Sequence, residues 1–134
     1  MRGPKTMSEQ PSGADLLKTA RSALLDELLS DVPERRRYMA LMIANAMAIA
    51  ARELELGDGV DRAELTSLRM LYRDPVPDSS EEVAARLEAL NRRLCDDIRH
   101  GRFLGLADEA RLRDHLRRST KARVAINNPK ALKS

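Results

Sequence analysis

The sequence has a single cysteine, Cys95, no tryptophan, and only three aromatic residues, Tyr38, Tyr72 and Phe103. One cysteine excludes an intramolecular disulfide framework and a zinc site built from cysteines. So few aromatic rings argue against a stacking platform for single-stranded nucleic acid. The sequence also lacks a glycine-rich phosphate loop and a Gly-x-Ser-x-Gly elbow, which argues against two common kinds of enzyme site. No single motif therefore identifies an activity.

Composition and length indicate one globular domain. Of the 134 residues, 43% are hydrophobic and 34% are charged, which is typical of a soluble folded protein. We expect a flexible tail over residues 1–11, a helical bundle domain over 12–129 and a C-terminal tail over 130–134. The first residues contain no apolar segment of the secretory type, so a cytoplasmic location is predicted.

Positive charge is concentrated towards the C-terminus. From Arg99 onwards the chain has ten Lys and Arg residues against three Asp and Glu, whereas acidic residues are in excess before it. This asymmetry is typical of a helix face that meets an acidic partner surface, and it also occurs in proteins that bind nucleic acid. A nucleic-acid contact would use the basic residues Arg111, Arg113, Arg117, Arg118 and Lys121.

Apolar residues recur at intervals of three and four, which predicts an all-α protein of about five helices. Ser12 and Asp15 resemble a capping box at the start of the first helix, and Gly57 is expected to end the second. Asp108 is expected to cap the fifth helix, and Pro129 to close it. Two prolines predict a loop over 74–78. The expected helices span residues 13–30, 33–56, 62–73, 79–101 and 108–127.

The second expected helix is the most apolar segment. Between Tyr38 and Ala51 only Asn45 is polar, and this stretch is shorter than the ~20 residues that a membrane span requires. A helix that is apolar on all sides is typically buried. We therefore expect a single-domain bundle in which the other helices surround this Ala- and Met-rich helix.

A stripe of polar residues interrupts the apolar helix faces. Arg123 falls near the middle of the apolar face of the last helix, where an arginine requires a partner. Glu53 is the nearest acidic candidate. The stripe is either a buried polar network that fixes the register of the helices or a small pocket for a carboxylate or phosphate. Such a pocket would be formed by Asn45, Arg52, Glu53, Arg123 and Asn128.

Other candidate sites are weaker. Asp96 and His100 are four residues apart on one helix face, but the second such pair that a metal site needs is missing. His115 is expected at the surface, and Cys95 as a small packed residue. Three arginines over 35–37 lie in the first turn of the second expected helix, where the helix dipole disfavours positive charge. They could form an anion site, or neighbouring acidic residues could neutralise their charge. We expect no metal and no cofactor.

Three segments, Asn45–Leu54, Leu94–Gly101 and Arg123–Pro129, resemble a bacterial family of short helical proteins known only as a domain of unknown function. Its pattern is Asn-Ala-x-Ala-Ile-x-x-Arg-Glu, then Ile-Arg-x-Gly, then Lys-x-Ala-Val-x-Asn-Pro. The resemblance covers nearly everything from Ser12 to Pro129. The chain departs from the pattern at Arg123, where the family usually has lysine.

The resemblance implies an accessory role beside enzymes whose genes are neighbours of this family. Members of this family tend to be encoded near, or fused to, enzymes that resemble aminoglycoside phosphotransferases and acyl-CoA dehydrogenases. We therefore favour a non-enzymatic accessory or interaction protein, whose partner is a phosphotransferase-like or acyl-CoA-metabolising enzyme or a second copy of itself. The alternatives are a small-anion site on the polar stripe and, less favoured, nucleic-acid binding. No membrane partner is expected.

Overall fold

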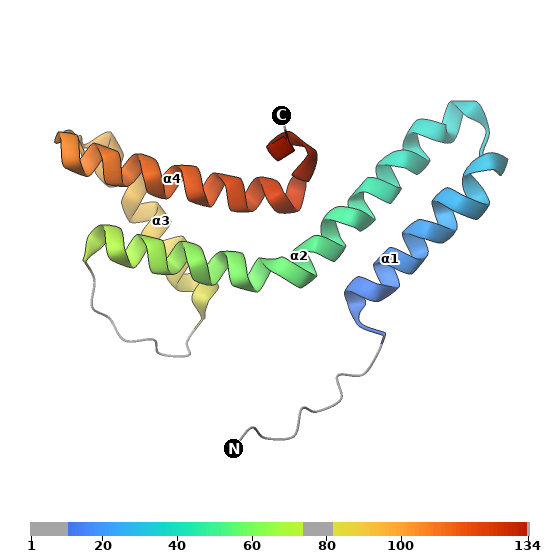
Figure 1. Cartoon of the computed structure of the whole chain (residues 1–134), viewed down its shortest axis with the longest axis horizontal. Helices are drawn as coiled ribbons and strands as arrows, with labels where there is room; N and C mark the ends of the chain where they lie inside the picture. Colours follow the sequence, from blue (N-terminus) through green and yellow to red (C-terminus); the bar gives the residue numbers. More distant parts are fainter. Residues whose placement is uncertain (1–10, 74–81, 134) are drawn as a thin grey trace, which may run out of the picture. The chain divides into compact units, whose positions relative to one another are not determined.

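The structure, a computed structural model, describes residues 11–73 and 82–133, and the regular structure within those ranges is entirely helical. The all-α prediction is therefore confirmed (Figure 1). Nearly all of the predicted N-terminal tail and the predicted loop over 74–78 lie outside the described residues. The four α-helices are α1 (Gly13–Ala23), α2 (Glu34–Tyr72), α3 (Val83–Arg99) and α4 (Leu106–Asn127).

Shorter helical turns flank these helices. A π-helical turn, η1 (Leu24–Leu28), and a 3-10 turn, η2 (Leu29–Asp31), follow α1. A second 3-10 turn, η3 (Pro129–Lys133), follows α4, so most of the predicted C-terminal tail is helical. The start of α1 agrees with the sequence: the Ser12 hydroxyl accepts a hydrogen bond from the Asp15 amide and the Asp15 carboxylate accepts one from the Ser12 amide.

The prediction of five helices was wrong because the second and third form one helix, α2. Gly57 was expected to end a helix, yet both Gly57 and Gly59 lie within α2. Each glycine in a helix interior costs about 1 kcal/mol relative to alanine. Packing on both sides offsets this cost, since Ala51 before the glycines and Leu65 after them are buried.

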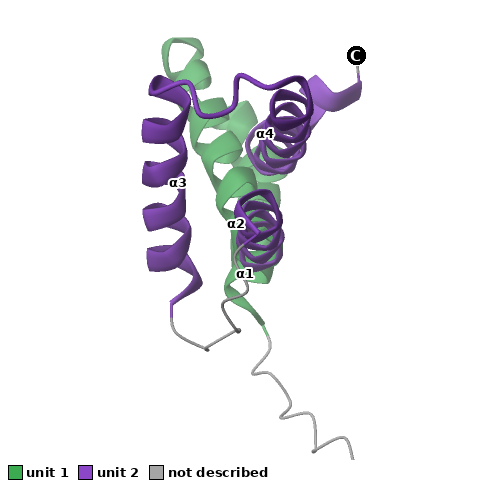
Figure 2. Ribbon diagram, turned by 90° about the vertical axis from the view of Figure 1, so that its left-hand side faces the viewer, with its two compact units in different colours: residues 1–56 green, residues 57–134 purple. Residues whose placement is uncertain are grey.

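The chain forms two compact units, Met1–Leu56 and Gly57–Ser134, shown in green and purple in Figure 2. In the first unit, α1 and the first part of α2 form an antiparallel hairpin. Gly13 packs so closely against Leu54 that a Cβ in its place would lie 3.3 Å from Leu54 Cδ1. Nε of Arg21 donates a hydrogen bond of 3.1 Å to the carbonyl oxygen of Ala44. Small residues thus allow the two helices to approach closely.

The expectation that this part of α2 is buried on all sides was not met. Ala40, Ala44 and Ala51 are buried, in keeping with the close approach of α1. Within the first unit, α1 packs against one face of α2 and leaves the other faces of this segment uncovered. The larger apolar residues of the same segment are exposed: Tyr38, Met39, Leu41, Met42 and Ile43.

The second unit contains the main apolar core, to which the last part of α2, α3 and α4 contribute. The α2 and α3 contributions recur at intervals of three and four, so each helix buries one stripe. Leu112 and Phe103 pack against this core, and Ile126 near the end of α4 is only 1% exposed. The buried core residues are Leu65, Leu68, Leu71, Leu87, Leu90 and Leu94.

A polar cluster holds the turn between α3 and α4. The buried Asp97 carboxylate accepts a hydrogen bond of 2.7 Å from the Tyr72 hydroxyl and lies 3.3 Å from Nε of Arg102. The Tyr72 ring meets Phe103 edge to face. Gly101 supplies the left-handed backbone conformation, with a φ of 72°, at the helix end where the sequence predicted it. These contacts hold the turn after α3 against the end of α2.

Candidate functional site

The five residues of the predicted polar stripe are divided between the two units. Asn45, Arg52 and Glu53 belong to the first, and Arg123 and Asn128 belong to the second. Asn45, Glu53 and Asn128 are exposed, whereas Arg52 and Arg123 are half-buried. The expectation that Asn45 lies within a buried apolar face was therefore wrong.

Arg123 is paired, but with other acidic residues than Glu53. Its Nη2 lies 2.6 Å from Oδ1 of Asp61 and 2.8 Å from Oε2 of Glu64, both on α2. The other Glu64 oxygen accepts a hydrogen bond of 3.0 Å from Asn91 of α3. Burial lowers the pKa of Arg123, but the hydrogen bonds to Glu64 and Asp61 outweigh burial and raise that pKa above its ordinary value. This cluster links three helices, so the network interpretation fits Arg123.

His115 is buried, not at the surface as predicted. It is 2% exposed, and its Nδ1 lies 2.7 Å from the Ser67 hydroxyl oxygen. Burial, and to a lesser extent the charge of Arg118, lower the pKa of His115, while Glu64 acts in the opposite direction. The net effect is a pKa of His115 below its ordinary value. Ser67 lies inside α2, where the neighbouring backbone amides are already bonded within the helix and so cannot form an oxyanion hole beside the Ser67–His115 pair.

The remaining predicted candidates lie on helix surfaces. Nδ1 of His100 is 2.7 Å from the carbonyl oxygen of Asp96, which is the expected contact within one helix. Within residues 11–73 and 82–133, no group of three or more His, Cys, Asp or Glu side chains could hold a metal ion. Cys95 is exposed, so its predicted packing was wrong. The three arginines over 35–37 are also exposed.

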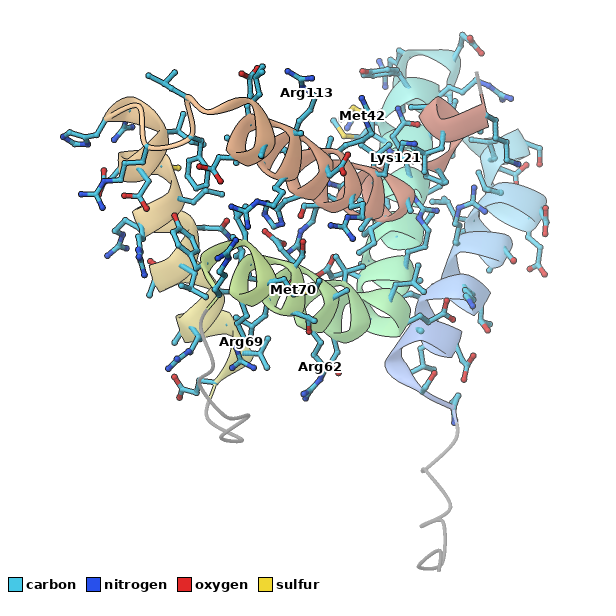
Figure 3. The ribbon with its side chains drawn as sticks, turned by 60° about the vertical axis from the view of Figure 1, so that its left-hand side comes forward. Met42, Arg62, Arg69, Met70, Arg113 and Lys121 are labelled. Atoms are coloured by element: carbon cyan, nitrogen blue, oxygen red, sulfur yellow. The ribbon has the colours of Figure 1, made fainter. Side chains whose placement is uncertain are left out.

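A groove runs along α4 on the surface of the second unit, and we call it the α4 groove. It has a volume of about 470 Å³. Apolar side chains with a spacing of four, Leu112 and Leu116, form its floor, and Leu116 is 42% exposed. Three basic residues with the same spacing follow its edge: Arg113, Arg117 and Lys121. Arg113 and Lys121 both project from α4 in Figure 3.

The charge of the α4 groove is unevenly compensated. Nη2 of Arg113 is paired with Oε1 of Glu109 at 2.7 Å, one helical turn earlier. Arg111 is similarly paired with Asp108. Arg117 and Lys121 form no ion pair with any part of the chain that the structure describes. The second half of the groove therefore carries uncompensated positive charge beside exposed apolar surface.

The next finding concerns the part of the chain that the structure describes, and the comparisons after it concern the full sequence. None of its helices is both long enough and apolar enough to cross a lipid bilayer. A family model described as "Domain of unknown function (DUF6285)" matches residues 30–131, which include all of α2, α3 and α4. Searches of curated proteins and of solved structures find no match to the chain.

Proposed function

The chain belongs to the DUF6285 family, a domain of unknown function, and on that premise we propose that it is an interaction protein whose α4 groove binds an acidic amphipathic helix of a partner protein. The observation that carries this proposal is the combination of an apolar floor, formed by half-buried Leu112 and exposed Leu116, with a basic edge. An amphipathic helix binds a groove of this kind through apolar side chains spaced by three and four residues. Acidic side chains on the edge of that helix would meet Arg117 and Lys121.

Electrostatics support a partner of acidic character. Complementary charges on the edge of an interface accelerate association and select among partners, while the apolar centre supplies most of the affinity. Arg117 and Lys121 have no carboxylate partner within the described residues, so a partner's carboxylates would not have to displace an existing ion pair. Leu116 offers apolar surface that association would remove from water.

Nucleic acid fits this groove less well. Of the basic residues expected to contact phosphates, Arg111 and Arg113 are already paired with carboxylates of α4. The leucine floor makes no favourable contact with phosphates, which dominate non-specific nucleic-acid binding. An acidic amphipathic helix would contact both parts of the groove, with apolar side chains on the floor and carboxylates at the basic edge.

The family resemblance implies the identity of the partner. We infer that the acidic helix belongs to a phosphotransferase-like or acyl-CoA-metabolising enzyme encoded near this chain in a bacterium, and that the complex forms in the cytoplasm. A small-anion site on the polar stripe is less well supported, because the Arg123 guanidinium is already bonded to Asp61 and Glu64.

A defined peptide tests the chemistry of the α4 groove. The probe is a fluorescein-labelled amphipathic peptide with leucines on one helical face and glutamates along its edges, and its binding is followed by fluorescence anisotropy. We expect the 134-residue chain to bind it, and the double variant Arg117→Glu/Lys121→Glu to bind roughly tenfold more weakly or worse. The double variant Arg35→Glu/Arg36→Glu changes the net charge equally, at a helix N-terminus that tolerates acidic residues.

The controls separate the alternatives. The Arg35→Glu/Arg36→Glu variant is expected to bind like the unmodified chain, and a scrambled peptide of the same composition is expected to bind weakly. No binding of the amphipathic peptide, or equal losses in both double variants, would overturn the proposal. Tight binding of duplex DNA at physiological salt that Arg117→Glu/Lys121→Glu abolishes would favour nucleic acid instead.

A further inference from the structure

A second and smaller cavity lies between α2 and α4 within the second unit. It has a volume of about 150 Å³ and shares no residue with the α4 groove. Most of its wall is apolar and comes from small or branched side chains, Val60 and Ala63 of α2 and Ala122 of α4. A cavity of this size holds a molecule of about six non-hydrogen atoms, as an engineered cavity of similar volume holds benzene.

Hydroxyl groups supply the polar part of the wall. Ser67 of α2 and Ser119 of α4 both line the cavity. The Ser67 hydroxyl is held at 2.7 Å by the buried ring of His115, so it has a fixed position rather than a free rotation. A fixed hydroxyl at an otherwise apolar wall orients a ligand with little loss of entropy on binding.

The uncompensated charge at this cavity is positive. Glu64 lines the wall, but its two oxygens already accept hydrogen bonds from Asn91 and Arg123. Arg118 also lines the wall, and its one hydrogen bond with the described residues is a long one, 3.4 Å from Nε to the Asp114 carbonyl oxygen. Its terminal nitrogens are therefore available to a ligand that enters the cavity.

We propose that this cavity binds a short-chain aliphatic carboxylate. The carboxylate is bound by the guanidinium of Arg118 and the hydroxyl of Ser119, and the aliphatic chain packs against the apolar wall. Arg118 suits this task because a guanidinium can donate two parallel hydrogen bonds to one carboxylate. The proposal is independent of the α4 groove, since different residues carry it.

Butyrate is a suitable probe because its six non-hydrogen atoms match the cavity. Binding is followed by titration of the isotope-labelled chain with NMR detection of the Ser67 and Ser119 amides and of the His115 ring. We expect saturable shifts of these signals with butyrate, and at least tenfold weaker binding of both butylamine and inorganic phosphate. The bound negative charge is also expected to raise the pKa of His115.

Three variants test the assignment of residues. Arg118→Gln removes the charge from an exposed side chain and is expected to weaken butyrate binding at least tenfold. Ala122→Leu is expected to abolish binding by filling the cavity, and Arg92→Gln, an exposed position on α3, serves as the matched control and is expected to bind normally. Absence of saturable shifts, unchanged affinity in Arg118→Gln, or phosphate binding as tight as butyrate binding would overturn the proposal.

Discussion

Nη2 of Arg123 in α4 donates a hydrogen bond of 2.8 Å to Oε2 of Glu64, which lies 59 residues earlier on α2. The same nitrogen also reaches Asp61 at 2.6 Å, so the contact uses one atom and not the two-nitrogen fork of a guanidinium. A lysine ammonium, which is a single donor centre, can make equivalent contacts. This geometry predicts that lysine can replace arginine at this position with little loss of the contact.

The Arg123 contact leads to a prediction about stability. We expect Arg123→Ala to lower the free energy of unfolding by about 1–2 kcal/mol, less than for a fully buried pair because the side chain is partly exposed. Arg123→Lys is expected to cost less than about 0.5 kcal/mol. Urea denaturation measures both. Equal losses for Ala and Lys would contradict the single-nitrogen account, and a double-mutant cycle with Glu64→Gln isolates the pair.

The continuity of α2 leads to a second prediction. Gly59 has helical geometry, and a Cβ added there would meet nothing within 4 Å. Gly59→Ala is therefore expected to raise the free energy of unfolding by about 0.5–1 kcal/mol. Gly101→Ala is the contrasting variant, because its φ is 72° and a Cβ would lie 2.9 Å from Leu104 Cδ1. Thermal melts that show Gly59→Ala destabilising the chain would indicate that the helix ends near Gly57.

Buried His115 leads to a prediction about pH. Burial lowers its pKa in the folded chain below the ordinary value of 6.5. Below about pH 6.5 the unfolded chain therefore binds more protons than the folded chain, and stability falls as pH falls towards the lower pKa. The groups facing the ring are Ser67 and Glu64 of α2 and Arg118 of α4. Because Arg118 reinforces burial and Glu64 only partly opposes it, the sign is a loss of stability in acid.

Chemical denaturation between about pH 7 and pH 5.5 measures this dependence. We expect the loss of stability on acidification to be smaller in His115→Gln than in the unmodified chain. His100→Gln replaces an exposed histidine and is expected to retain the full dependence. If His100→Gln and His115→Gln change the pH profile equally, the pH dependence does not come from the buried ring.

The Tyr72 hydroxyl leads to a fourth prediction. It donates the 2.7 Å hydrogen bond to buried Asp97, and desolvation together with this bond raises the pKa of Tyr72 far above its ordinary value. Tyr72→Phe keeps the edge-to-face contact with Phe103 but removes a donor from a buried carboxylate. We expect a loss of about 1–2 kcal/mol in the free energy of unfolding. A neutral effect in urea denaturation would mean that Arg93 and Arg102 satisfy Asp97 without Tyr72.

The sequence predicted helix ends well where one residue type has a specific conformational role. Ser12 with Asp15 begins α1, and Gly101 follows α3 with a positive φ, both as expected. The expected cap Asp108 was wrong, because α4 begins at Leu106 after Gly105 and Asp108 lies within its first turn. Gly57 misled the prediction because glycine marks a helix end only where a left-handed conformation is required. Gly57 and Gly59 have no such conformation, and packing on either side keeps α2 continuous.

The candidate site was harder to predict, because it depends on the rotation of α4. His115, Ser119, Ala122 and Ile126 share a helical spacing of four and three, and that pattern was the available signal for a buried histidine. Orienting α4 by its apolar residue Leu116 shifted the expected buried face by one residue along the helix. His115 was therefore wrongly expected at the surface. The partners of Arg123 could not be predicted from distance along the chain, because Asp61 and Glu64 reach it only through the packing of α2 against α4.

The central proposal is that the α4 groove binds an acidic helix of a partner enzyme, which we infer to be a phosphotransferase-like or acyl-CoA-metabolising enzyme encoded near this chain. The most direct test is isothermal titration calorimetry of the 134-residue chain with that enzyme. We predict a saturable one-to-one complex that Arg35→Glu/Arg36→Glu preserves and that Arg117→Glu/Lys121→Glu weakens by roughly tenfold or more. Absence of heat of binding, or equal affinity for the unmodified chain and Arg117→Glu/Lys121→Glu, would contradict it.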